Sequence, residues 1–171
     1  MLIGYPPSSP AVMSNLILVH VVTGLAGIAS GLIVVARITL GRRVTWLNAV
    51  FILTTFASCA TGFVFLPTDG VTSAQLVAFF ITFLLSIAAY ALYVGRLEGS
   101  WNQIYALTAV GVSFLNTLIT TTQTFLHVSA LNAIAPTEQS PLYVAVKLTL
   151  LCVFLVVAIV AARRAGRSSQ E

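Results

Sequence analysis

Five long apolar runs separated by short polar segments constrain the fold of this chain more than any other feature. The runs cover residues 14–36, 46–66, 73–93, 103–128 and 142–162. A helix needs about 20 apolar residues to cross the hydrocarbon core of a bilayer, and each run reaches that length. Because an α-helix satisfies all its backbone hydrogen bonds internally in lipid, the pattern predicts an all-α integral membrane protein, a bundle of five transmembrane helices.

The composition leaves no room for a separate soluble part. The chain has 171 residues, of which 58% are hydrophobic and 7% are charged, whereas a soluble domain carries about 25% charged residues. We therefore expect residues 1–171 to form a single transmembrane domain with the lipid bilayer as its main partner. The net charge of +4 does not indicate a nucleic-acid partner, because the basic residues flank the apolar runs and form no patch of their own.

The basic residues predict how the chain is threaded. All of them except Lys147 follow the first, third and fifth runs: Arg37, Arg42, Arg43, Arg96, Arg163, Arg164 and Arg167. Lys and Arg are enriched in cytoplasmic loops. The predicted topology therefore has the N-terminus outside and the C-terminus in the cytoplasm, and the expected location is the bacterial cytoplasmic (inner) membrane.

Aromatic residues and Lys147 give further expectations for the ends of the spans. Amphipathic rings prefer the membrane–water interface, which is where we expect Trp46, Trp101, Tyr105 and Tyr143. Lys147 lies five residues into the last run, where we expect its side chain to snorkel to the surface. The alternative for Lys147 is an ion pair with Glu138 in the loop before that run.

Two runs carry polar residues at helical spacing. One face of the first run holds His20, Gly24, Gly27 and Gly31, and one face of the fourth holds Asn116, Thr120, Gln123 and His127. Ionisable and polar groups in a membrane face the protein interior or a wet cavity, and they are functional candidates. With the predicted topology, both histidines lie in the outer half of the membrane.

These residues suggest a ligand site between the first and fourth spans. His20 and His127 have the imidazole nitrogens that coordinate the iron of haem b, and Gly24 and Gly27 would leave clearance for its ring. A quinone could instead hydrogen-bond to His127 and Gln123. If haem binds, Asn116 and Gln123 would orient water or a quinone beside it.

Helix packing explains the same pattern without a ligand. Gly27 and Gly31 form a GxxxG motif, which brings two membrane helices close together, and amide side chains serve as interhelical hydrogen-bond partners. His127 would then lie in the headgroup region. On the second run, Thr55, Ser58 and Gly62 are likewise typical of a packing surface, or of a wall for a lipid or pigment.

The segment from Phe125 to Thr137 (FLHVSALNAIAPT), the His20 face with its glycines, the basic first loop and Gly62 together support a resemblance. Over about residues 14–162 the chain resembles a family of small bacterial predicted multi-span membrane proteins of unknown function. The resemblance implies a helical cytoplasmic-membrane protein and no particular activity.

The sequence carries no recognisable catalytic motif, and no span contains Asp or Glu. We therefore predict a non-catalytic accessory or structural subunit that packs with membrane-protein partners or with copies of itself. One alternative is a b-type haem or quinone-binding electron-transfer protein that uses His20 and His127. A second alternative is an oligomeric permease whose path is lined by the polar face of the fourth run.

Overall fold

The structure is a computed structural model that describes residues 10–42, 46–64 and 73–167. Over these residues it is entirely helical, with the elements α1 (Pro10–Thr39), α2 (Trp46–Val64), α3 (Ser73–Tyr93), α4 (Ser100–His127), α5 (Ser129–Ile134) and α6 (Pro141–Arg167). All except the short α5 are long and apolar enough to cross a membrane, which gives five candidate spans. The chain is therefore a multi-pass membrane protein.

The helices extend beyond several of the predicted runs. α1 begins at Pro10 and not near residue 14, because proline is tolerated in the first turn of a helix. α6 continues to Arg167, since a helix does not stop where its apolar stretch stops. The prediction missed α5, whose six residues are far too few for a span. Residues 67–72, which separate the predicted second and third runs, and Arg43 lie outside the described residues.

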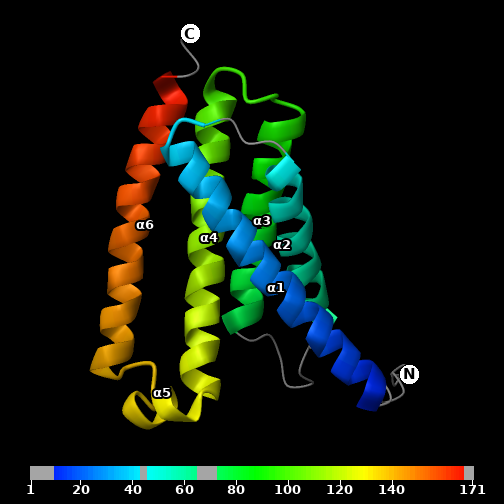
Figure 1. The fold of residues 1–171 in the computed structure, drawn as a ribbon, viewed down its shortest axis with the longest axis vertical. Helices are drawn as coiled ribbons and strands as arrows, with labels where there is room; N and C mark the ends of the chain where they lie inside the picture. The colour runs from blue at the N-terminus through cyan, green and yellow to red at the C-terminus, as the bar shows by residue number, and fades with distance from the viewer. Residues whose placement is uncertain (1–9, 43–45, 65–72, 168–171) are drawn as a thin grey trace.

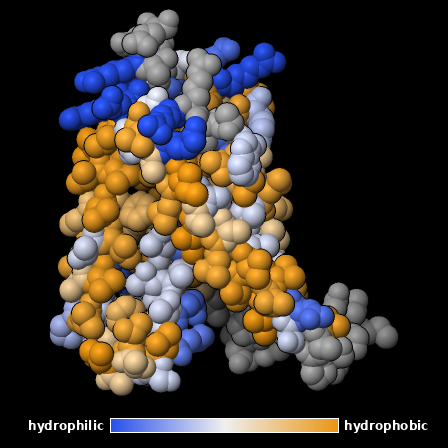
Figure 2. All heavy atoms as spheres, in the orientation of Figure 1, coloured by the Kyte–Doolittle hydropathy of each residue, from blue (hydrophilic) through white to orange (hydrophobic). Residues whose placement is uncertain are grey.

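The long helices alternate in direction, so that the end of α1, the start of α2 and the α3–α4 connection lie at the same end of the bundle as the C-terminus (Figure 1). All described arginines belong to this end: Arg37, Arg42, Arg96, Arg163, Arg164 and Arg167. Figure 2 shows hydrophilic side chains gathered there above a largely apolar surface. We call it the arginine end. The gathering of arginines agrees with the charge pattern, whereas the orientation of the bundle in a membrane stays a prediction.

The arginine half of the bundle is the better packed half. Its core includes Val34, Phe51, Leu85, Ala88, Tyr105 and Val112, all at most 2% exposed. Inside it, the Tyr105 hydroxyl donates to Asn48 Oδ1 at 2.7 Å. Because this internal acceptor satisfies the hydroxyl, the whole phenol of Tyr105 is buried in the bundle. Its place at the level of the membrane interface stays a prediction.

At the opposite end, α6 is fixed to α4 and to its preceding loop. Tyr143 is 2% exposed, its hydroxyl donates to Thr122 Oγ1 at 2.7 Å, and its ring meets Phe125 edge to face at 5.3 Å. Tyr143 is therefore also a packing residue. Lys147 Nζ lies 3.1 Å from Glu138 Oε2 and 4.2 Å from the Tyr143 ring centroid. The alternative of a Lys147–Glu138 ion pair is the one observed.

The glycine face of α1 packs against hydroxyl groups. A Cβ atom at Gly24 would lie 3.1 Å from Ser58 Oγ, and one at Gly27 would lie 2.9 Å from Thr55 Oγ1. At Gly31 the added atom would lie 2.8 Å from both Phe51 Cε2 and Ser113 Oγ. Small residues at such contacts allow membrane helices to approach closely. Gly31 therefore fixes α1 against both α2 and α4.

Replacing this glycine should destabilise the bundle. We expect Gly31→Ala to lower the free energy of unfolding by about 1–3 kcal/mol, because the methyl group overpacks the contact. The measurement is denaturant unfolding in mild micelles. Gly111→Ala is the matched control, since its Cβ would make an ordinary contact with Leu84 Cδ1 at 3.4 Å. Equal losses in the two variants would contradict the account of Gly31.

The predicted orientation can be tested with C-terminal fusions. Because the arginine end carries the C-terminus, we expect a C-terminal fluorescent-protein fusion to be bright and a C-terminal alkaline phosphatase fusion to be inactive. An active phosphatase with a dark fluorescent protein would reverse the predicted topology.

Candidate ligand-binding cavity

A cavity of about 760 Å³ lies between α1, α2, α3 and α4. Its lining comes from residues 17–28 of α1, the first half of α3 and the second halves of α2 and α4, so it occupies the part of the bundle away from the arginine end. Apolar side chains form most of the wall, among them Ile17, Val21, Leu25, Ile28, Ile81 and Ile119. Ligand sites are typically clefts of about 300–1,000 Å³ with apolar walls and a few polar groups.

Five of the six predicted site residues line this one cavity: His20, Gly24, Asn116, Gln123 and His127. The sixth, Gly27, is buried against Thr55 of α2 and is not part of the wall. Gly24 contributes to the wall, but it too packs against Ser58. The α1 glycines therefore serve helix packing, as the GxxxG interpretation expects, and Gly27 provides no clearance for a ligand.

His20 is held by α2 through its Nδ1 atom. This atom lies 3.0 Å from the Ser58 carbonyl oxygen and 3.0 Å from Thr61 Oγ1. The carbonyl can only accept, so the hydrogen bond requires a proton on Nδ1. In the neutral imidazole the lone pair is then on Nε2, which becomes the acceptor or ligand atom of the ring.

Gly62 completes the seat of the His20 ring. A Cβ atom at Gly62 would lie 3.3 Å from His20 Cε1, which is a tight contact. The Thr61 hydroxyl is 2.9 Å from the Ala57 carbonyl, to which it donates, so its oxygen remains able to accept from His20. α2 therefore fixes both the position and the tautomer of this histidine.

His127 occupies the mouth of the cavity. It is the last residue of α4, and its side chain is exposed, as is that of Gln123 one turn earlier. Asn116 and His20 lie further in and are partly buried. The two histidines thus contribute to one cavity at different depths, one at its mouth and one on its wall.

Sequence reasoning missed the contribution of α2 and α3. Ser58 and Thr61 hold His20, and Gln75 and Ala78 of α3 close the side of the cavity opposite α1. The small-residue face of α2 is typical of a packing surface or of a wall for a lipid or pigment, and Thr55, Ser58 and Gly62 line the cavity. The sequence offers one signal for this contribution. Ser58 and Gly62 share a face of α2, and they lie about as far from the arginine end as the His20 face of α1 does.

The cavity is closed towards the arginine end. The wall residues Thr55 and Ile81 are followed, one helical turn further on, by Phe51 and Leu85, which belong to the packed core. Within the described residues the cavity is therefore a blind pocket and not a pore through one subunit.

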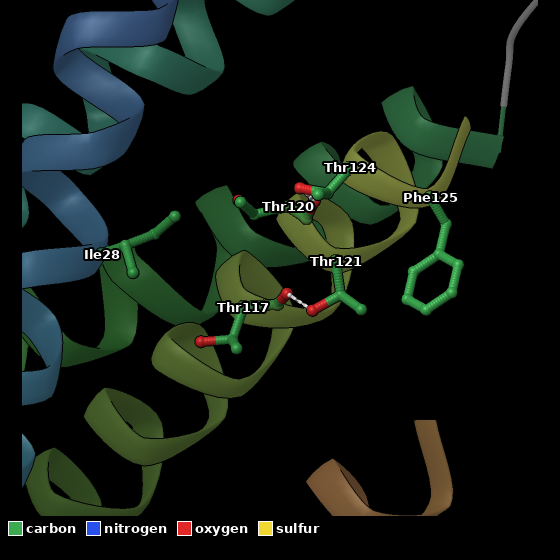
Figure 3. Close-up of a pocket in the computed structure, with 6 residues that line it drawn as sticks. All are labelled: Ile28, Thr117, Thr120, Thr121, Thr124 and Phe125. Atoms are coloured by element: carbon green, nitrogen blue, oxygen red, sulfur yellow. Dashed lines mark hydrogen bonds between the residues drawn. The ribbon is translucent and has the colours of Figure 1, made fainter. Parts of the chain in front are cut away.

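A smaller hollow of about 190 Å³ lies beside the cavity, between α1 and α4 (Figure 3). It is lined by Ile28, Thr117, Thr120, Thr121, Thr124 and Phe125. Ile28, Thr120 and Thr124 also line the large cavity. In Figure 3, Ile28 extends from α1 towards the threonines of α4. The two hollows therefore adjoin each other where α1 and α4 move apart.

Comparison with known proteins gives no relative: no protein-family model, no curated protein and no solved structure matches this chain. The resemblance drawn from the sequence therefore assigns no family. The five long apolar helices support only its coarser part, a multi-span membrane protein.

The exposed mouth predicts that water reaches the cavity. After both native cysteines are replaced by alanine, we expect Gln123→Cys to react with a charged aqueous methanethiosulfonate reagent. Leu107→Cys is the control, because Leu107 lies on the same helix, is 47% exposed on the outer surface of the bundle and lines neither hollow. We expect this surface to face lipid. Mass spectrometry measures the labelling; equal reactivity at the two sites would contradict a wet mouth.

Proposed function

We propose that this multi-pass membrane protein binds a neutral, lipid-soluble small molecule of the quinone class in the large cavity between α1, α2, α3 and α4. One observation carries the proposal. Among the described residues that line the cavity, the polar groups are imidazoles, amides, hydroxyls and a thiol, and none is Asp, Glu, Lys or Arg. Such a wall suits an uncharged ring with hydrogen-bonding oxygens, because an unpaired charge in this setting would be costly.

The polar groups match both oxidation states of a quinone. The carbonyl oxygens of the oxidised ring accept hydrogen bonds, and the amide groups of Asn116 and Gln123 can donate them. The hydroxyls of the reduced ring donate, and the imidazole rings of His20 and His127 can accept. The apolar wall then contacts the faces of the ring. A protein with these groups would hold a quinone through its redox cycle.

Haem b is the second candidate, and one observation favours it. A metal-bound histidine usually donates its other ring N–H to a carbonyl or carboxylate group, and His20 donates Nδ1–H to the Ser58 carbonyl. His20 and His127 would then be the axial ligands. However, haem carries two carboxylates, and the described lining offers no cation to pair with them. We therefore rank the quinone first.

The other two roles predicted from the sequence, an accessory subunit and an oligomeric permease, account less well for the cavity. An accessory subunit would act through the lipid-facing surface, and ligand binding is compatible with that role. An oligomeric permease would need a path between subunits, because the packed core closes the cavity within one subunit. Neither role explains why polar groups from four helices converge on one hollow.

Binding can be measured directly with a water-soluble, tailless benzoquinone. In equilibrium dialysis against the protein in lipid nanodiscs, we expect saturable binding. His20→Ala should weaken it about five- to tenfold, because a lost hydrogen bond costs about 1 kcal/mol or slightly more.

Leu107→Ala, on the lipid-facing side of α4, is the matched control and should bind like the wild type. Absence of saturable binding to the wild type, or identical binding by wild type and His20→Ala, would overturn the proposal. A haem α-band in a reduced-minus-oxidised visible spectrum would show that the ligand is haem and not a quinone.

A further inference from the structure

We infer that the smaller hollow between α1 and α4 receives the linear apolar tail of the ligand whose head group occupies the cavity. This inference rests on the proposed function and narrows it to molecules with a ring head and a hydrocarbon chain. The supporting observation is continuity: Ile28, Thr120 and Thr124 line both hollows.

The wall of the smaller hollow is chemically suited to hydrocarbon although it is rich in threonine. Thr117 donates its hydroxyl to the Ser113 carbonyl at 2.8 Å, and Thr121 donates to the Thr117 carbonyl at 2.8 Å. The Thr124 hydroxyl likewise donates to the Thr120 carbonyl at 2.7 Å. Since these hydroxyl protons are used by the backbone of α4 itself, mainly methyl groups, Ile28 and Phe125 remain to contact a ligand.

The packing of α1 against α4 determines where the hydrocarbon tail of a ligand can pass between the two helices. At Gly31 the backbone of α1 approaches Ser113 of α4 too closely to leave space between the helices. One turn nearer the mouth, at Ile28, the two helices border a hollow instead. On the other side of α4, Phe125 is held by Tyr143 of α6, which keeps this wall in place. A hydrocarbon tail can therefore leave the cavity sideways between α1 and α4, at a level further from the arginine end than the Gly31 contact.

A sideways exit is needed because the cavity is blind towards the arginine end. A lipid-soluble molecule reaches the protein from the bilayer, and its tail gains little by leaving lipid for an apolar protein surface. The hollow should therefore control which tailed molecules can bind, and contribute little affinity. An acyl chain of a bilayer phospholipid has the same chemistry as a quinone tail, and the experiment separates the two sources.

The test compares a plug with a matched control. Thr121→Trp fills the smaller hollow and does not touch the large cavity, whereas Leu107→Trp adds the same ring on the lipid-facing side of α4. The two probes are tailless benzoquinone, and a competitor with the same head and a ten-carbon tail. We expect Thr121→Trp to weaken the tailed competitor by about tenfold or more, which is at least about 1.4 kcal/mol.

Binding of the tailless probe should stay within about twofold of wild type in both tryptophan variants, which also shows that they fold. Unchanged competition by the tailed probe in Thr121→Trp, with intact tailless binding, would overturn the tail site while leaving the proposed function standing. Failure of the tailless probe to bind the wild type would overturn both.

A second measurement needs no variant. The tailed quinone, with a photoreactive diazirine at the tip of its tail, is bound to wild-type protein in nanodiscs and irradiated. We expect labelling within residues 117–125, prevented by excess tailed quinone and not by added phospholipid. Labelling prevented by phospholipid alone would assign the hollow to a bilayer lipid, and labelling confined to other segments would exclude a tail there; either result would overturn the inference.

Discussion

The close contact of α1 with α2 and α4 at Gly31 is the constraint on which the rest of the structure depends. The absence of a side chain there brings Phe51 and Ser113 against the α1 backbone. Beyond this contact α1 stays on α2 through Gly27 and Gly24, but it moves away from α4. One half of the bundle is thereby packed and the other is hollow. The cavity begins where α1 no longer presents a glycine to α4.

Polar groups in lipid are placed by the need for hydrogen-bond partners, and this explains most of the interior. Tyr105 donates a hydrogen bond to Asn48, Tyr143 donates one to Thr122, and Lys147 forms an ion pair with Glu138. His20 uses one nitrogen on the backbone of α2. His20, Asn116, Gln123 and His127 differ from the three bonded pairs because they line a hollow large enough for a ligand. That difference separates the candidate site from ordinary interhelical hydrogen bonding.

The helical class and the five spans could be predicted because lipid imposes length and hydropathy on any crossing segment. Helical periodicity also grouped His20 with Gly24, and Gln123 with His127, and these residues line one cavity. Periodicity defines faces of single helices, however, and does not say which helices face each other. The enclosure of His20 by Ser58, Thr61 and Gly62 of α2 therefore could not be predicted, nor could the burial of Tyr105, which depends on Asn48 from another helix.

The central claim is that the cavity holds an uncharged ring compound, and the most direct test is to identify what the protein retains. The wild type and His20→Ala would be purified in mild detergent from bacterial membranes that contain quinone. Each would be examined by ultraviolet and visible reduced-minus-oxidised spectra and by analysis of an organic extract. The account predicts a quinone signal close to one per protein in the wild type, a clear loss in His20→Ala, and no haem α-band. An extract without quinone, equal retention by the two proteins, or a haem spectrum would contradict it.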